Sequence, residues 1–250
     1  MDFPLGDELK TSMVATGVWQ EGAPLPIERL ARVPVTYVDF DGLVHDDGEI
    51  IVMDVIAEAV AALFERLRSL EFPLASVRGL HHYGGSDDAS MADNNSSSFN
   101  CRHVEGSSTL SLNAYGVAID INPLYNPFVV FDEPAGKARI FPSAGWRYMN
   151  RRLQRPGMVE KIAPILDELG FSIWGGDWTT PIDYHHFQVP RGLAELLAGS
   201  SLAEGRRLFD LARCLGGLKS MPSGEPLQAS LSAFDGDGCA LLKANAESWC

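Results

Sequence analysis

Residues 111 to 122 read Ser-Leu-Asn-Ala-Tyr-Gly-Val-Ala-Ile-Asp-Ile-Asn, a polar turn followed by a short apolar run. The run after Gly116 predicts a buried strand over residues 116–121 that carries Asp120. A carboxylate inside an apolar strand is costly unless it is paired or bound to a metal. The stretch therefore indicates a functional carboxylate, with an aspartate that closes a turn onto Asn122 as the structural alternative.

A second polar stretch, residues 183 to 187, reads Asp-Tyr-His-His-Phe. A catalytic zinc site needs three imidazole or carboxylate donors that converge on the metal, with the fourth position left to water. Asp120 and His186 can supply two of these donors. The alternative is that the two histidines are partly buried and bonded to backbone.

These motifs together resemble those of a known family. The pattern S-x-H-x-x-G-x-A-x-D, followed downstream by W-G-G-D-W and D-Y-x-H-F, is similar to that of the peptidoglycan zinc peptidases. These are the D-Ala-D-Ala carboxypeptidases and L-Ala-D-Glu endopeptidases, relatives of the vancomycin-resistance dipeptidases. Residues 93–102 also resemble the family's approach to its site. The matching motif positions are Ser111, Gly116, Ala118, Asp120, Asn122, Pro123, 174–178, Asp183, Tyr184, His186 and Phe187.

The resemblance runs from about residue 35 to residue 189 and implies an α+β fold. A small, mainly antiparallel sheet with flanking helices is expected, as in the hedgehog and D,D-peptidase-like fold. We divide the chain into an extended N-terminal lead-in (1–34), a zinc-peptidase-like catalytic domain (35–190) and a helical C-terminal extension (191–250). The extension lies outside the resemblance.

The resemblance assigns roles to five positions in this chain. Zn²⁺ would be held by Asp120, by His186 and at position 113. Asp183 would act as general base and then as general acid, taking a proton from zinc-bound water and passing it to the leaving amine. Arg102 would bind the substrate carboxylate or steady the oxyanion, with a surface arginine as the alternative.

The choice between His185 and His186 rests on the family's spacing, in which the base lies three residues before the histidine ligand. Asp183 is three residues before His186, whereas Ile182 precedes His185 by three and cannot act as a base. In a flat strand residues 183 and 186 face opposite sides, so a turn or bulge must separate them. His185 is then expected at the pocket rim or behind a ligand.

Further residues are expected around the substrate, a peptidoglycan stem peptide or another peptide of the D-Ala-D-Ala type. Trp174, Trp178 and Tyr115 are predicted pocket walls, although aromatic residues are more often simply core. Asp177 is expected to orient a ligand, or else to make the turn after Gly176. Ser111 is also expected to bind the substrate.

Asn113 stands where the family carries histidine, and its neutral amide oxygen is a poor zinc donor. The leading hypothesis is a zinc metallopeptidase of the D,D-carboxypeptidase or L-Ala-D-Glu endopeptidase type, impaired by Asn113. The second is a catalytically inactive relative that binds cell-wall peptides. In a third, Asn113 was introduced into an active parent.

Charge and hydropathy exclude several other classes. The net charge of −13 argues against a protein that follows nucleic-acid phosphates. No apolar run is long enough to span a membrane. The N-terminus lacks the basic and apolar regions of a signal peptide, although the family's substrate implies the cell envelope or a secreted protein. The four cysteines show no C-x-x-C spacing and are interpreted as buried or incidental thiols.

Periodicity and turn residues predict the remaining elements. A strand is expected over 35–40 and a helix over 54–70 with Asp54 as its cap. Residues 84–98 are expected to form a long polar loop that flanks the site together with Arg102. A helix over 158–169, kinked at Pro164, and helical structure over 191–216 follow. Short strands are expected over 171–174 and 184–189.

Overall fold

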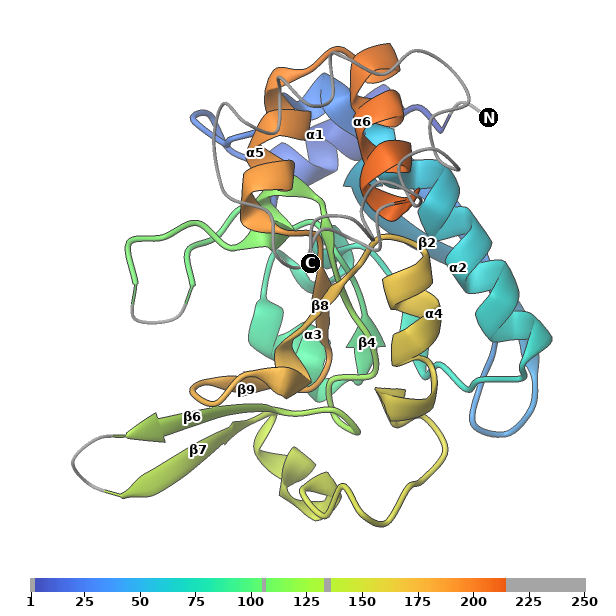
Figure 1. Ribbon diagram of the computed structural model, residues 1–250, viewed down its shortest axis with the longest axis vertical. Helices are drawn as coiled ribbons and strands as arrows, with labels where there is room; N and C mark the ends of the chain where they lie inside the picture. The colour runs from blue at the N-terminus through green and yellow to red at the C-terminus, as the bar shows by residue number, and fades with distance from the viewer. Residues whose placement is uncertain (1–2, 105–106, 133–135, 215–250) are drawn as a thin grey trace, which may run out of the picture.

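The computed structural model describes residues 3–104, 107–132 and 136–214, as helices and short strands (Figure 1). The helices are α1 (Asp7–Ala15), α2 (Ala57–Ser69), α3 (Asp87–Ala92), α4 (Ala163–Glu168), α5 (Arg191–Gly199) and α6 (Leu202–Cys214). The strands are β1 (Leu30–Val38), β2 (Val44–Met53), β3 (Ser76–Val77), β4 (Asn95–Ser96), β5 (Ala118–Asp120), β6 (Phe128–Asp132), β7 (Lys137–Phe141), β8 (Ile173–Trp174), β9 (Ile182–Asp183) and β10 (His186–Gln188).

The central sheet brings the two polar stretches of the sequence together. Its strand order is β5-β10-β8, with both pairings antiparallel. A second antiparallel sheet has the order β7-β6-β9, while β3 and β4 form a parallel pair. Helices with small, mainly antiparallel sheets confirm the predicted α+β class.

The β1–β2 hairpin and α2 form the largest part of the core, and they confirm the strand and the helix predicted there. Leu63 and Leu67 of α2 are fully buried in the same cluster as Ile50 of β2. The expectation that Asp54 caps the helix is wrong, because no side chain caps α2. The Asp54 carboxylate instead accepts hydrogen bonds from Arg29 at 2.8 and 3.1 Å.

The N-terminal segment is not an extended lead-in, because α1 lies within it. Leu9 and Met13 are one helical turn apart; Met13 is fully buried and Leu9 packs partly buried against the core. Only two apolar side chains of this nine-residue helix face the core, which gives too short a period to detect in the sequence. Figure 1 shows α1, α5 and α6 gathered at one end of the molecule.

Residues 84–98 contain α3 and β4, so the expected long loop is partly regular structure. Ser86 caps α3 by accepting a hydrogen bond from the backbone N–H of Ala89. The Asn95 side chain bonds both the N–H and the carbonyl of Arg78. Polar side chains typical of loops serve here as partners for buried backbone groups, which is why the composition misled the prediction.

Two more predicted helices differ in detail from the structure. Pro164 lies in the first turn of α4, where no intrahelical N–H is needed, and does not kink a longer helix. Helices α5 and α6 confirm the helical prediction after residue 190. One hydrophobic cluster includes Leu5, residues of the predicted central domain and Phe209. The division into three segments stays a prediction.

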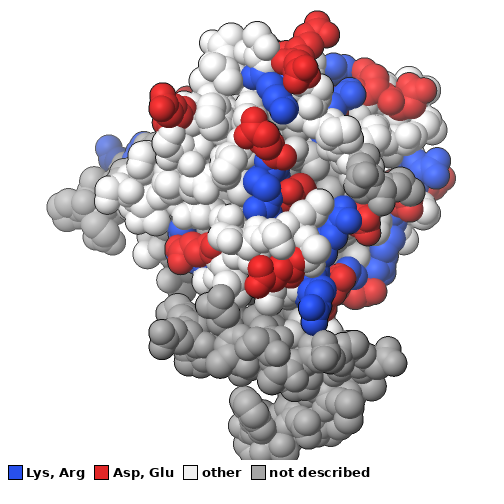
Figure 2. Space-filling model, turned by 90° about the horizontal axis from the view of Figure 1, so that it is seen from above, with Lys and Arg blue, Asp and Glu red and all other residues white. Residues whose placement is uncertain are grey.

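Charges of both signs alternate on the surface seen from above in Figure 2. No described helix is long and apolar enough to cross a membrane. Cys101 is a free, buried thiol, as expected. Cys214 is disulfide-bonded, which corrects the expectation of an incidental thiol there, and Cys239 and Cys250 lie outside the described residues.

Gly116 is packed directly against β2. A Cβ atom at this position would lie 2.7 Å from the Met53 backbone nitrogen and 3.1 Å from the Val52 carbonyl carbon. Its φ of 65° is left-handed, and it ends the 3₁₀ turn η4 (Leu112–Tyr115) that carries Asn113. Gly84 ends a similar turn with a φ of 60°, but a Cβ there would meet nothing within 4 Å.

This pair of glycines separates backbone strain from steric clash. Gly84→Ala should cost about 1–2 kcal/mol, the penalty of a left-handed alanine. Gly116→Ala should cost about 1–3 kcal/mol more, because the β2 backbone must also move. Urea unfolding of both variants measures the difference. If both variants lose the same free energy of unfolding, the β2 backbone accommodates the added methyl group at no cost.

Candidate functional site

Asn113, Asp120 and His186 meet at the pairing of β5 with β10, where Asp120 lies opposite His186. The Asp120 Oδ1 atom lies 2.8 Å from His186 Nδ1. Asn113 on η4 donates from Nδ2 to Asp120 Oδ2 at 2.9 Å. All three residues are buried. The tertiary structure thus brings the three predicted ligand positions together.

The orientation of the Asn113 amide follows from its neighbours. Its Nδ2 atom also donates to the Ser98 carbonyl at 2.9 Å, so two groups that can only accept surround it. Its Oδ1 atom accepts from the Ser111 hydroxyl at 2.8 Å. A flipped amide would set oxygen against oxygen. The one atom of Asn113 able to bind a metal therefore faces Ser111.

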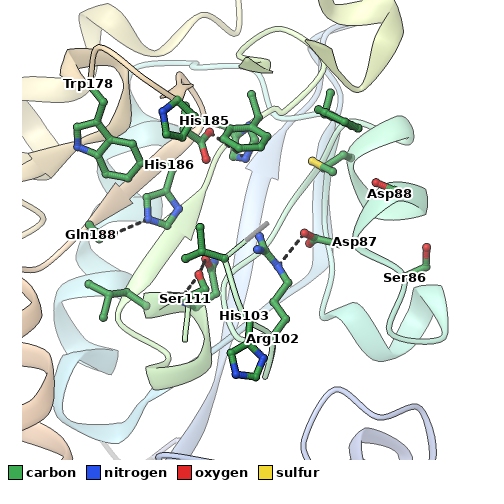
Figure 3. A pocket seen from close by; sticks show the side chains of 18 of the residues that line it. Ser86, Asp87, Asp88, Arg102, His103, Ser111, Trp178, His185, His186 and Gln188 are labelled. Carbon is green, nitrogen blue, oxygen red and sulfur yellow. Dashed lines mark hydrogen bonds and ion pairs between the residues drawn. The ribbon is translucent and has the colours of Figure 1, made fainter. Parts of the chain in front are cut away.

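His186 is held between two acceptor oxygens. Its Nδ1 faces Asp120, and its Nε2 lies 2.8 Å from Gln188 Oε1, a contact drawn in Figure 3. Burial favours the neutral ring, but the Asp120 carboxylate outweighs it and raises the pKa of His186 to about 9. Burial likewise opposes the charge on Asp120, yet His186 lowers the pKa of that carboxyl to about 2. The two form a buried ion pair.

This arrangement does not fit a catalytic zinc. A protonated imidazole has no lone pair to offer, both oxygens of Asp120 already accept hydrogen bonds, and the Asn113 oxygen is turned away. Zinc would have to displace a proton and these bonds and would then gain two good donors instead of three. The hydrogen-bonding groups of four side chains are instead paired with one another, those of Asn113, Asp120, His186 and Gln188.

Asp183 reaches the same pocket because Tyr184 and His185 form a turn between β9 and β10. This is the break in the strand that the spacing required. His185 is buried, with Nδ1 2.8 Å from the Asn126 carbonyl and Nε2 3.1 Å from Asp183 Oδ1. Burial raises the pKa of Asp183, while His185 and His186 act in the opposite direction. A carboxylate with a raised pKa is a stronger base, but its catalytic role stays a prediction.

A cavity of about 490 Å³ opens beside this network. Trp178, Phe128, Phe141 and Pro181 supply apolar surface to its wall. Arg102 enters from another side, and its Nε lies 2.8 Å from Asp87 Oδ2 of α3, as Figure 3 shows. The prediction that Arg102 and the 84–98 segment border one cleft is thereby confirmed.

The remaining predicted residues divide into two groups. Ser111, Trp178 and His185 line the cavity. Trp174, Tyr115 and Asp177 are not among its lining residues. Trp174 instead stacks on Phe187 and donates to the Tyr184 carbonyl, Tyr115 packs against the core, and Asp177 is exposed.

Several lining residues were missed by the sequence reasoning. Gln188 follows His186 by two residues and therefore shares its face of β10, a period-two signal that was available. Asp87 carries no such signal, because its place opposite Arg102 depends on how α3 packs. The other missed positions are Val104, Leu112, Phe128, Phe141, Pro181 and Arg191, whereas Ser86, Asp88 and Met91 lie in the 84–98 segment that was predicted to flank the site.

Comparison with known proteins gives one match. Residues 105–189, about a third of the chain, match the model of a peptidase family described as D-alanyl-D-alanine carboxypeptidase. Neither the curated proteins nor the solved structures gave a significant match. The matched region spans Asn113, Asp120 and His186. Residues 105–189 are therefore similar to the D-alanyl-D-alanine carboxypeptidase family, which agrees with the resemblance of the sequence motifs to the peptidoglycan zinc peptidases.

Proposed function

We propose that this pocket binds the carboxyl end of a D-Ala-type cell-wall peptide and, with Asn113 in place, hydrolyses it slowly or not at all. The observation that carries the proposal is the closed network of Asn113, Asp120 and His186, in which each donor is satisfied by its neighbours. The family match supports the ligand class, because the matched family is named for peptides that end in D-alanine.

The pocket offers matching chemistry for such a peptide. The Arg102 guanidinium is suited to a terminal carboxylate, which must compete with Asp87 for it. The apolar wall that includes Trp178 and Phe128 suits the methyl groups of alanine. Gln188 and Ser111 border the cavity and can hydrogen-bond a peptide group.

A zinc peptidase is the second candidate, and the family match favours it. In that case zinc would displace the His186 proton, and Asp183 would serve as the base. Both candidates share a peptidoglycan partner, which implies action at the cell envelope or outside the cell. Incubating the zinc-loaded wild-type protein with muropeptides separates them, since release of D-Ala or cleavage after L-Ala occurs only in a peptidase.

Arg102→Ala should weaken binding of an acylated D-Ala-D-Ala peptide about 10- to 100-fold. A hydrogen bond to a charged group contributes about 1.5–3 kcal/mol, and the variant removes the guanidinium that faces the cavity. Isothermal titration of both proteins measures the change. Arg152→Ala is the matched control, because Arg152 is exposed and is not among the lining residues.

Two outcomes would count against the carboxylate-anchor role. One is equal affinity of the Arg102→Ala and wild-type proteins. The other is that the wild-type protein binds a peptide amide as tightly as the free acid, because the amide lacks the terminal charge that Arg102 should bind. A wild-type protein that binds neither peptide would remove the proposed function itself.

A further inference from the structure

Glu49, His81 and His82 form a second cluster of metal-ligand side chains, away from the residues that line the pocket. Glu49 is on β2, and the two histidines are consecutive in the 3₁₀ turn η3 (Leu80–Tyr83). The Nε2 atom of His81 lies 3.2 Å from Glu49 Oε1, and that of His82 lies 3.1 Å from the same oxygen. Three donor atoms thus converge.

The spacing of these atoms matches a metal site. Zinc binds histidine nitrogen and carboxylate oxygen at about 2.0–2.2 Å, so two donors of a tetrahedral site lie about 3.3 Å apart. The two measured N–O separations are close to this value, and all three donors lie within 4.8 Å of one another. Both separations are also hydrogen-bonding distances, so an ion would have to replace the ring protons that face Glu49 Oε1.

The surroundings hold the three side chains in place. Arg32 pairs with the other oxygen of Glu49, which fixes the carboxylate and leaves Oε1 toward the histidines. Gly79 permits the His81 ring to lie where it does, since a Cβ atom there would come within 2.7 Å of the ring. The Glu49 and His81 side chains are 7% and 9% exposed, whereas His82 is 42% exposed. The open side of the cluster is therefore at His82.

Electrostatics act in both directions at this cluster. The Glu49 carboxylate, which attracts a cation, pairs with Arg32 through one oxygen and contacts both histidine rings through the other. The Arg32 guanidinium repels a cation, although it bonds only the oxygen farther from the histidines. Two imidazoles and one carboxylate are ligand types that zinc prefers.

We propose that Glu49, His81 and His82 bind a zinc ion, with water completing the fourth position on the His82 side. The ion links η3 to β2. Only Gly84, Gly85 and Ser86 separate η3 from α3, so the link also fixes the start of the helix that presents Asp87 to Arg102. The argument for this zinc site does not rest on the proposed peptide-binding function.

Zinc titration of chelator-treated protein tests the proposal. The wild-type protein should bind Zn²⁺ tightly, and His82→Ala should weaken that binding at least about 100-fold. Removing a residue that only hydrogen-bonds to a metal ligand lowers metal affinity about 10- to 100-fold, and removing the ligand itself should lower it by no less. His82 is the preferred position because its exposed side chain can be removed without opening the core. Circular dichroism confirms folding.

Two further variants complete the design. His45→Ala is the control, since His45 is also partly exposed and pairs with a carboxylate, that of Asp39. Asp120→Ala tests whether zinc binds instead in the pocket beside Asn113 and His186. The expected result is that zinc binding survives both changes, and that thermal unfolding of the wild-type protein, but not of His82→Ala, shifts upward with zinc.

The proposal is overturned if the wild-type protein binds no zinc, if His82→Ala binds it as well as wild type, or if His45→Ala weakens binding equally. Zinc binding that disappears only in Asp120→Ala, while circular dichroism shows that variant to be folded, would also place the ion elsewhere. Peptide titrations on the same proteins are read separately, so failure of the metal site and failure of the proposed function are distinguishable.

Discussion

Asn113→His is expected to raise the zinc affinity of the pocket at least about 100-fold and to bring hydrolysis of D-Ala-D-Ala or L-Ala-D-Glu peptides with it. An imidazole supplies the lone pair that the amide lacks, so the variant has the three-donor set of a catalytic zinc site. It also removes the Asn113 hydrogen bond to Asp120, which frees one carboxylate oxygen.

The measurement is best made in a His82→Ala background, where zinc binding by Glu49, His81 and His82 does not add to the signal from the pocket. Zinc titration and release of D-alanine from muropeptides are then compared with and without Asn113→His. Asn113→Gln is a control that keeps an amide. The double variant Asn113→His, Asp120→Asn should lose what Asn113→His gains, because a second donor is missing.

Two results would contradict this expectation. Full zinc occupancy and peptidase activity with Asn113 in place would mean that another donor completes the site, with His103 and His185 as candidates. No gain of zinc or activity in the histidine variant would mean that the pocket no longer supports hydrolysis. The second result favours a protein that only binds peptides.

Asp120→Ala is expected to lower the free energy of unfolding by about 3–5 kcal/mol at pH 6 in the presence of a chelator. Removing one partner of a buried ion pair leaves the other charge without compensation. In Asp120→Ala, His186 loses its carboxylate partner and the Asn113 amide loses a hydrogen-bond acceptor. Asp177→Ala should change stability by no more than about 0.5 kcal/mol, because Asp177 is exposed.

The size of this loss should depend on pH in a defined direction. The pKa of His186 is raised from 6.5 to about 9, so its contribution is fully present below pH 6.5 and is lost as pH rises through 9. The pKa of Asp120 is lowered from 3.8 to about 2, so its contribution is present above pH 3.8 and is lost as pH falls through 2. The pair therefore stabilises most between these limits.

Urea unfolding of wild type, Asp120→Ala and Asp177→Ala across this range provides the test. The gap between wild type and Asp120→Ala should be largest near pH 5–6 and should narrow above pH 9. A gap that stays constant from pH 5 to pH 10 would show that His186 carries no charge in the folded protein. The buried ion pair would then be the wrong description of the site.

The sequence by itself determined the elements whose signals are local. The apolar run around Asp120 is the strand β5, and the stripe of residues 56–70 is α2. The motif spacing also predicted that Asp120, His186 and position 113 meet, because a fixed order of motifs reflects a fixed fold. That Arg102 borders the site with the preceding polar segment was predictable for the same reason.

The tertiary structure alone decided what those residues do to one another. The direction of the Asn113 amide depends on Ser98 and Ser111, which only folding places beside it. Trp178 lines the cavity and Trp174 the core, although the sequence treats them alike. Hydrogen bonds act over about 3 Å and depend on direction, whereas sequence patterns record only which residues are buried and at what period. The donors and acceptors that hold His186 as a cation become visible only when partners distant in sequence lie in contact.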